Sequence, residues 1–239
     1  MKIIADLHTH TLASGHAYST VNELALAAAQ AGLQGMAITD HGPALPGGPH
    51  RYHFCAMRFI PKTIAGVRIF RGVEANILAE KGTLDLDQEV LEDLDFVMAG
   101  LHENCGFCGQ DRDRNTRAVL SAMENPRVKC ISHPGNPLFP LHYEEIALGA
   151  LATQTALEIN NSSLTSLSRK GSCGNCAEIA ALCARVGAPV MIGSDAHISQ
   201  GVGVFDDALK LVAQAGIAEG QVVNASWQRL LDFLGLTES

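Results

Sequence analysis

The sequence predicts a parallel α/β protein, because short β-rich segments alternate with longer Ala- and Leu-rich segments about seven times. The β-rich segments are apolar throughout, which is typical of strands that are buried on both faces. The 239 residues are 47% hydrophobic and contain no linker or low-complexity run, so we expect one domain over residues 1–239. A closed (β/α) barrel and an open doubly wound sheet both fit this pattern. The length suits a small barrel, and no glycine-rich phosphate loop follows the first strand.

The sequence predicts seven strands and eight helices. The expected strands are Ile3–Leu7, Gly35–Thr39, Val67–Val73, Phe96–Gly100, Val128–Ser132, Ala156–Asn160 and Pro189–Gly193. The expected helices are Val21–Ala31, a segment within Phe54–Ala65, Gln88–Asp93, Asn115–Met123, Tyr143–Thr153, Cys176–Val186 and Phe205–Ala215. We expect a last helix, Ser226–Leu234, to pack across one end of the molecule.

Charge and composition exclude several classes of protein. Lys and Arg number 17 against 25 Asp and Glu, and the chain has no basic run, so nothing indicates a protein that coats nucleic acid. No stretch reaches the roughly 18 apolar residues that a membrane span needs. The first residues lack the apolar core and cleavage site of a signal peptide, so we expect the protein in the cytosol. The odd number of cysteines, seven, favours reduced thiols or metal ligands there, and no heptad indicates the oligomeric state.

Histidine and acidic residues follow the predicted strands at their C-terminal ends. His8 and His10 follow the first strand, and residues at positions i and i+2 share one face. Six of the seven strands end in this way, on the face where barrel enzymes carry their chemistry. The full set is His8, His10, His16, His41, Glu74, His102, His133, Asp195 and His197.

Taken singly, each of these residues has an ordinary explanation, such as a histidine at the rim, an ion-paired Glu74 or a turn capped by Asp195. Nine of them on one rim would leave a large cluster of charge and lone pairs without partners unless cations bind there. Nine ligands exceed one tetrahedral site, so we expect two or three divalent ions, with zinc first and manganese or iron as alternatives. Clustered ions of this kind indicate a hydrolase.

Six short strings surround these ligands: Asp6-Leu7-His8-Thr9-His10, Thr39-Asp40-His41-Gly42, Gly72-Val73-Glu74-Ala75-Asn76, Gly100-Leu101-His102, Ser132-His133-Pro134-Gly135-Asn136 and Gly193-Ser194-Asp195-Ala196-His197. In order and spacing they resemble the PHP (polymerase and histidinol phosphatase) family. Further strings are similar to the YcdX-type branch of probable phosphatases: Ser14-Gly15-His16-Ala17-Tyr18-Ser19-Thr20, Met57-Arg58, Asn160-Asn161-Ser162-Ser163 and Ser168-Arg169-Lys170-Gly171-Ser172.

This resemblance implies a distorted, TIM-like (β/α)7 barrel with a trinuclear metal centre that hydrolyses phosphoesters. The matching family motifs imply three groups of ligands. One ion would be surrounded by His8, His10, Glu74 and Asp195, a second would be held by His16, His41 and His197, and a third by His102 and His133. Glu74 would bridge the ions, and a hydroxide shared between two of them would attack phosphorus in line. A polymerase subunit is excluded, because 239 residues leave no room for a polymerase.

Other polar residues are candidates for supporting roles. Asp6 and Asp40 could orient the imidazoles that bind metal, or make ordinary turn contacts. Arg169 and Lys170 follow the one strand that lacks a ligand, so they are candidates for binding the substrate phosphate, against the alternative of solvated loop charges. Arg58 is a weaker candidate for the same role.

Two C-x-x-C pairs lie outside the pattern of the PHP family. Cys105 and Cys108 come just after His102, and Cys173 and Cys176 follow the sixth strand. We expect both loops on the same face of the molecule. The four thiols could form an extra zinc or iron–sulfur site or a redox-sensitive disulfide, or they could be incidental loop and helix residues.

Four functions compete at this point. The first is a metal-dependent phosphatase that acts on small phosphomonoesters, and the second is a phosphodiesterase or 3′–5′ exonuclease with the same metal chemistry. The net charge of −8 disfavours long nucleic-acid substrates. An amidohydrolase leaves His16, His41 and Glu74 unexplained as a set. A non-catalytic scaffold stabilised by metals has no need of nine ligands.

Overall fold

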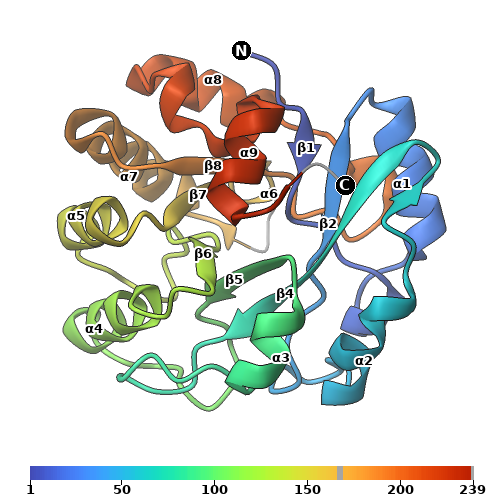
Figure 1. Ribbon diagram of the computed structural model, residues 1–239. Coiled ribbons are helices and arrows are strands. Elements are labelled where there is room, and N and C mark those ends of the chain that lie inside the picture. Colours follow the sequence, from blue (N-terminus) through green and yellow to red (C-terminus); the bar gives the residue numbers. More distant parts are fainter. Residues whose placement is uncertain (166–168, 238–239) are drawn as a thin grey trace.

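The computed structural model describes residues 1–165 and 169–237, which form a nearly closed parallel barrel surrounded by helices (Figure 1). The strands are β1 (Ala5–Asp6), β2 (Gly35–Ile38), β3 (Thr63–Ile64), β4 (Val67–Asn76), β5 (Phe96–Gly100), β6 (Val128–Ile131), β7 (Ala156–Asn160) and β8 (Val190–Gly193). They pair in parallel in the order β1-β2-β4-β5-β6-β7-β8, and only the short β3 is antiparallel, to β4. The predicted α/β barrel is therefore confirmed. An open doubly wound sheet is excluded, because the strand order never reverses.

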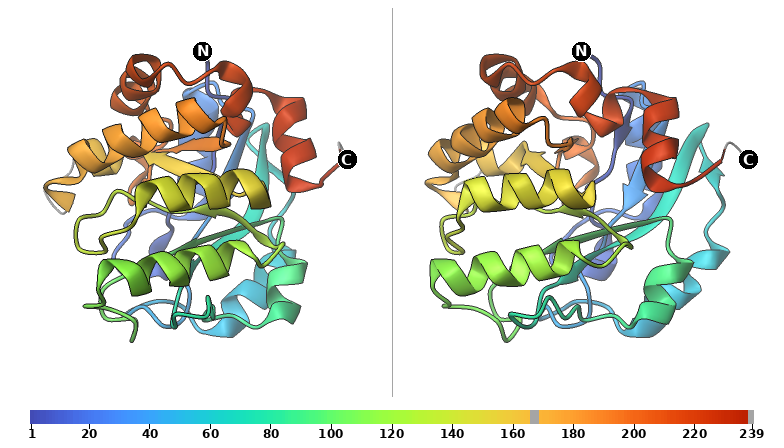
Figure 2. Two further views of the ribbon diagram at one scale, coloured as in Figure 1. Left: turned by 90° about the vertical axis from the view of Figure 1, so that its left-hand side faces the viewer. Right: turned by 60° about the vertical axis from the view of Figure 1, so that its left-hand side comes forward.

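The helices lie outside the strands and cover the barrel. They are α1 (Val21–Gln30), α2 (Arg51–Ala56), α3 (Gln88–Asp93), α4 (Arg112–Met123), α5 (Tyr143–Thr153), α6 (Ser162–Thr165), α7 (Ser172–Val186), α8 (Asp206–Ala215) and α9 (Trp227–Leu234). Figure 2 shows α4, α5 and α7 side by side on one flank. Within residues 1–165 and 169–237, no helix is both long enough and apolar enough to cross a membrane.

Side-chain caps determine where several helices begin. The Thr20 hydroxyl accepts a hydrogen bond from the backbone N–H of Glu23, whose carboxylate accepts one from the N–H of Thr20. This reciprocal capping box starts α1, and the carboxylates of Asp87 and Asp111 cap α3 and α4 in the simpler manner. These caps limit the length of the loops that carry polar residues between strand ends and helices.

Two apolar layers hold the barrel together. One layer lies between the strands and the outer helices. The second fills the barrel interior with inward-facing strand residues such as Leu7, Phe70 and Phe96, against which α9 packs Leu230 and Leu231. A Cβ on Gly35, at the start of β2, would lie 3.0 Å from the Trp227 ring, so α9 covers the end of the barrel where the strands begin. The predicted packing of the last helix across one end is confirmed, and the opposite end of the barrel stays open for a site.

β1 and β8 close the barrel incompletely, and one asparagine side chain joins them. At the C-terminal ends of the strands, the backbone N–H of His10 donates to the carbonyl of Ala196 at 2.9 Å. Further down, Asn224 lies between the strands. Its Nδ2 donates to the carbonyls of Ala5 (2.9 Å) and Ile192 (2.7 Å), and its Oδ1 accepts from the N–H of Ile192 (3.1 Å). Asn224 thus replaces backbone pairing between the first and last strands.

Replacing Asn224 with Ala should lower the free energy of unfolding by about 3–5 kcal/mol, because three buried backbone groups lose their partners. Urea denaturation followed by circular dichroism measures this change. The control is Gln228→Ala, which removes an exposed hydrogen bond to Asp232 and should change stability by less than about 0.5 kcal/mol. A loss below about 1 kcal/mol for Asn224→Ala would mean that the barrel closes without this side chain.

Some boundaries differ from those expected from the sequence. The helix expected within Phe54–Ala65 is right only at its start, because α2 ends at Ala56, a 3₁₀ turn (Met57–Phe59) follows, and β3 forms near the end of the range. The strand is short and pairs with β4, a tertiary contact that composition does not reveal. Ser168, which belongs to one string of the family resemblance, lies outside the described residues.

Candidate metal centre

The structure brings all of the predicted ligands together at the end of the barrel where the strands finish. Glu74 lies in β4, and the others lie in the loops that follow the strands. The buried members have exposed fractions of at most 8%, whereas His16 and His197 lie closer to solvent. The buried set is His8, His10, His41, Glu74, His102, His133 and Asp195.

Glu74 is fully buried and occupies the centre of the cluster. Its Oε2 lies 3.3 Å from His8 Nε2 and 3.0 Å from His41 Nδ1. Its Oε1 lies 3.1 Å from His102 Nε2 and 2.8 Å from His133 Nε2. One carboxylate therefore faces two separate groups of imidazoles, which is the arrangement that a bridging ligand requires.

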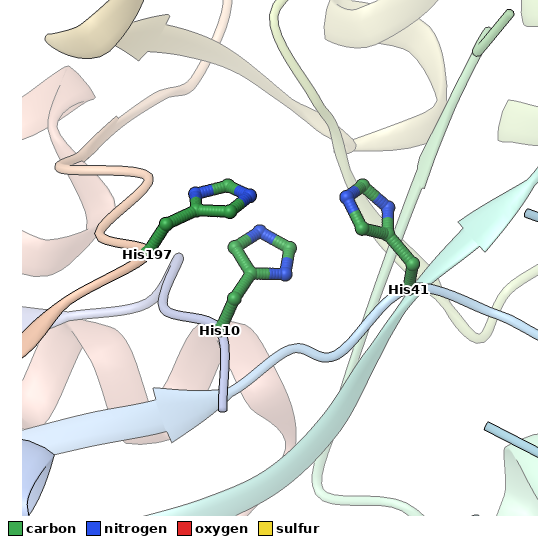
Figure 3. Close-up of side chains that lie close together, drawn as sticks. All are labelled: His10, His41 and His197. Atoms are coloured by element: carbon green, nitrogen blue, oxygen red, sulfur yellow. The ribbon is translucent and has the colours of Figure 1, made fainter. Parts of the chain in front are cut away.

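Asp195 extends the cluster toward solvent. Its Oδ1 lies 3.4 Å from His8 Nε2 and 3.3 Å from His10 Nε2. Beyond it, the Nε2 atoms of His197 and His16 are 3.0 Å apart. In Figure 3 the rings of His10 and His197 lie against each other, with the His41 ring on the other side of His10, and the ring centroids are 4.3 and 4.5 Å from that of His10.

Five buried atoms that face the interior of the cluster have no hydrogen-bond partner among residues 1–165 and 169–237. They are His8 Nε2, His10 Nε2, His41 Nδ1, Glu74 Oε2 and Asp195 Oδ1. Buried polar atoms are normally paired, and leaving several unpaired together is unfavourable. All five can offer a lone pair to a cation. The donor set, imidazole nitrogen with carboxylate oxygen, is the one that zinc and related divalent ions accept, so these residues fit such ions.

The hydrogen bonds behind the cluster orient the imidazole lone pairs inward. His8 Nδ1 lies 2.7 Å from Glu158 Oε1, so this nitrogen donates and Nε2 faces the cluster. Ser14 Oγ donates to Asp40 and accepts from His10 Nδ1 at 3.1 Å, which leaves His10 Nε2 free as an acceptor. His197 Nδ1 donates to the backbone carbonyl of Asp195 at 3.0 Å. Each arrangement is the tautomer that a metal ligand needs.

Burial keeps several of these rings neutral. It lowers the pKa of His10 to about 4, lowers the pKa of His41 well below its usual value, and is the main cause of the lowered pKa of His133. Burial also opposes protonation of His8, but the carboxylate of Glu158, with other acids nearby, holds the pKa of His8 well above its usual value. A divalent ion would therefore have to displace a proton at His8.

The two central carboxylates stay ionised despite their burial. Burial by itself would raise the pKa of Glu74, but the surrounding imidazoles, first that of His8, hold it well below its usual value. The pKa of Asp195 is likewise low, because the guanidinium of Arg169 outweighs burial together with the nearby imidazoles. Both residues thus present negative charge to the cluster at neutral pH.

Two residues of the cluster adopt left-handed backbone conformations that side chains rarely occupy. The φ angle is +31° at His133 and +58° at Asp195. Strained conformations of this kind persist where surrounding contacts hold them, and they are common at functional sites. Here the N–H of His133 donates to Glu158 Oε2 at 2.8 Å, and Asn160 Nδ2 donates to Asp195 Oδ2 at 3.2 Å. The residues of β7 therefore hold both strained positions in place.

Glu158 is the supporting residue that sequence reasoning missed. It is buried in β7, where it binds His8 Nδ1 and the backbone of His133, and its exposed fraction is 2%. Gly193 of β8 makes room for it, because a Cβ there would clash with Glu158 Oε1. The available signal was an acidic residue inside an otherwise apolar strand, since a buried charge needs a specific partner.

Replacing Glu158 with Gln should weaken metal binding or lower turnover by about 10- to 100-fold, because the neutral amide holds the His8 tautomer less firmly. Metal titration of the stripped protein, alongside turnover, measures the effect. Glu89→Gln is the matched control, since this side chain is 88% exposed. Unchanged metal affinity and turnover in a folded Glu158→Gln protein would contradict the role of Glu158 in orienting His8.

Asp40 and Asp6 support the site by different contacts. Asp40 accepts hydrogen bonds from the backbone and hydroxyl of Thr11 and from Ser14 Oγ at 2.7–2.8 Å, and so holds the serine that orients His10. Asp6 instead accepts from the backbone N–H groups of Ser194 (3.2 Å) and Gly203 (2.9 Å). Asp40 therefore acts on an imidazole through one intermediary, whereas Asp6 fixes backbone near the β8 end.

A cavity of about 610 Å³ opens above the cluster, and Arg169 forms part of its wall. Arg169 Nη1 donates to Asp195 Oδ2 at 2.5 Å and reaches Asn160 Oδ1 at 3.4 Å. Lys170 is exposed and does not line this cavity. Arg58 is also exposed, and its guanidinium lies over the Phe59 ring at 5.2 Å from the centroid. Of the three cations predicted to bind phosphate, the structure brings Arg169 to the site.

The two C-x-x-C pairs do not meet in this structure. All of their thiols are free, with Cys105 and Cys176 buried and Cys108 and Cys173 exposed. Cys105 Sγ lies 3.2 Å from Asn76 Oδ1. Across residues 1–165 and 169–237, the groups of side chains close enough to hold one metal ion contain His and Glu and no Cys. The structure therefore places no ligand set around the four thiols.

Comparison with known proteins agrees with the geometry. Residues 6–159 match the PHP domain. A protein of Syntrophotalea carbinolica named "Probable phosphatase" is 54% identical over 236 residues, which cover 99% of this chain and 98% of that protein. A "Probable phosphatase" of Thermoanaerobacter sp. (strain X514) is 45% identical over 234 residues, covering 98% and 95%.

A solved structure shares the fold. The histidinol phosphate phosphatase of Lactococcus lactis subsp. lactis, solved with zinc, L-histidinol and phosphate, superposes with a TM-score of 0.59 at 16% identity and covers 91% of this chain and 95% of that chain. The barrel, its cluster of imidazoles and carboxylates, and these relatives define a metal-dependent phosphoesterase, a hydrolase of the phosphatase class. The chain belongs to the PHP family.

Proposed function

We propose that this protein is a phosphatase that hydrolyses small phosphomonoesters at a trinuclear centre of divalent ions. The observation that supports this proposal is that five buried nitrogen and oxygen atoms without hydrogen-bond partners in the described part of the chain converge on one space beneath an open cavity. In this proposal the whole chain, residues 1–239, forms one enzyme domain. The ions are zinc in the first instance, with manganese or iron as alternatives.

The ligand-type residues divide into three groups around the ions. His8, His10, Glu74 and Asp195 would hold the first ion. His16, His41 and His197 would hold the second, and His102 and His133, with Glu74 as the bridge, would hold the third. The contacts of Glu74 Oε1 with His102 and His133, and of Glu74 Oε2 with His8, support the separation of the first ion from the third. When bound, such ions lower the pKa of water and neutralise charge on phosphoryl oxygens.

The protein's own residues provide position and charge. Glu74 and Asp195 hold fixed negative charge at the centre of the cluster. Glu158 and Ser14 orient the rings of His8 and His10. Arg169, already anchored on Asp195, presents a planar guanidinium at the wall of the cavity, where it suits two oxygens of a phosphate.

Hydrolysis of matched chromogenic substrates tests the proposed function. The metal-loaded protein should cleave 4-nitrophenyl phosphate with a kcat/KM about tenfold or more above that for bis(4-nitrophenyl) phosphate. Reloading the stripped protein with zinc, manganese or iron identifies the ion that supports the highest turnover. The reverse preference would establish a phosphodiesterase or exonuclease in place of the proposed function. No turnover on either ester with metals bound would favour a scaffold or an amidohydrolase.

A further inference from the structure

Part of the wall of the cavity above the metal centre is apolar. The apolar residues that line it are Leu45, Pro46, Leu101, Leu138 and Phe139. Leu138 is 52% exposed. A bound molecule can bury an exposed apolar surface that lies beside a polar site. The part of a substrate that extends away from the ions would therefore lie against hydrocarbon.

The charged groups of the same wall are few. In the described part of the chain, Arg169 is the one Lys or Arg side chain that lines the cavity, and Asp195 already engages its Nη1. Ser166, Leu167 and Ser168, which lie outside the described residues, are uncharged by sequence. Glu103 lines the cavity and is exposed. A second anionic group on a substrate would thus meet a carboxylate and no additional cation.

We propose that the cavity selects monophosphate esters whose alcohol part is uncharged and has an apolar face, and that it disfavours esters that carry a second anionic group. This inference rests on the proposed phosphatase function and adds the substrate class to it. The ions and Arg169 would hold the phosphate, the apolar wall would cover the body of the alcohol, and Glu103 would repel further negative charge.

Hydrolysis of three phosphomonoesters by the metal-loaded protein tests the preference for an apolar body and the discrimination against a second anion separately. Phenyl phosphate carries an apolar body, 4-carboxyphenyl phosphate adds an anion to that body, and glycerol 3-phosphate carries a polar body of smaller apolar area. We expect kcat/KM for phenyl phosphate to exceed that for each of the other two by about tenfold at low salt. Raising the salt to 0.5 M should reduce only the loss of kcat/KM that the carboxylate causes. At that ionic strength the Debye length is about 4–5 Å, so salt screens the repulsion between exposed charges.

Two substitutions locate the selectivity in the wall. Glu103→Lys should raise the ratio of kcat/KM for 4-carboxyphenyl phosphate to that for phenyl phosphate by about five- to tenfold at low salt. Leu138→Ala should lower kcat/KM for phenyl phosphate by about three- to tenfold relative to glycerol 3-phosphate. The controls are Glu124→Lys and Leu148→Ala, which change exposed residues outside this cavity; Leu148 is 50% exposed. Both controls should leave the ratios unchanged.

The outcomes distinguish failure of the proposed selectivity from failure of the proposed phosphatase function. If none of the three esters is hydrolysed with metals bound, the proposed function fails and the inference fails with it. If all three are hydrolysed with equal kcat/KM, the phosphatase function stands and the proposed selectivity is overturned. A ratio that Glu103→Lys does not move, while turnover persists, overturns the role of Glu103.

Discussion

Replacing Glu74 with Gln should lower phosphatase kcat/KM by about a thousandfold or more, because metal ions contribute several kcal/mol of charge stabilisation and each 1.36 kcal/mol is a factor of ten. Among residues 1–165 and 169–237, Glu74 is the one carboxylate that contacts both groups of imidazoles, at 2.8–3.3 Å from His133, His102, His41 and His8. A neutral amide has similar size but offers a single acceptor oxygen, so it cannot bridge two ions with both oxygens. Elemental mass spectrometry, alongside turnover, should show fewer ions per chain.

Folding must be measured separately, because Glu74 is fully buried. Circular dichroism should show an unchanged barrel, and Glu89→Gln, at an exposed site, should keep both the ions and the turnover. If the Glu74→Gln protein folds, retains all its ions and turns over normally, Glu74 is not a ligand of the metal centre.

Removing the ions with a chelator should abolish turnover and lower the melting temperature by at least about 5 °C. Each ion that binds only the folded state stabilises it by about 2.7 kcal/mol at a hundred times its dissociation constant. For a protein of this size, 1 kcal/mol corresponds to about 2–4 °C. The physical reason is that the buried lone pairs of His8, His10 and Glu74 have no hydrogen-bond partners of their own. Differential scanning calorimetry before and after chelation measures the shift.

Adding the metal back provides the control for chelation. The melting temperature should return and should rise further with the concentration of free metal, as mass action requires. The Glu74→Gln protein should show a smaller shift than the native chain. Equal melting temperatures with and without ions would show that the cluster is stable by itself, and the multi-ion assignment would then be wrong.

The strand–helix alternation and the list of nine candidate ligands could be read from the chain, because both depend on short-range patterns. An apolar segment of about five residues indicates a buried strand wherever it occurs. A His-x-His pair after such a strand, such as His8 and His10, points both rings to one side whatever the partners are. Parallel strands also bring their C-terminal ends to one edge of the barrel, so ligands far apart in the chain could be expected to meet.

The supporting residues could not be read in the same way, because their roles depend on contacts between distant segments. Glu158 meets His8 across 150 positions, and Asn224 meets Ala5 across 219. Motif spacing says nothing about such pairs unless strand order, register and twist are known. The same limit applies to the helix expected within Phe54–Ala65, where pairing with β4 makes a strand of Thr63–Ile64.

The sequence by itself determined the fold class, the family resemblance and the residues that could bind metal, since periodicity and local motifs encode these. Only the tertiary structure decided which atoms face each other. It placed Glu74 between two groups of imidazoles and tied Arg169 to Asp195, and within residues 1–165 and 169–237 it left the two cysteine pairs without a common ligand set. The reason is geometric: ligand distances and hydrogen-bond partners depend on ångström-scale positions, and packing of the whole barrel determines those positions.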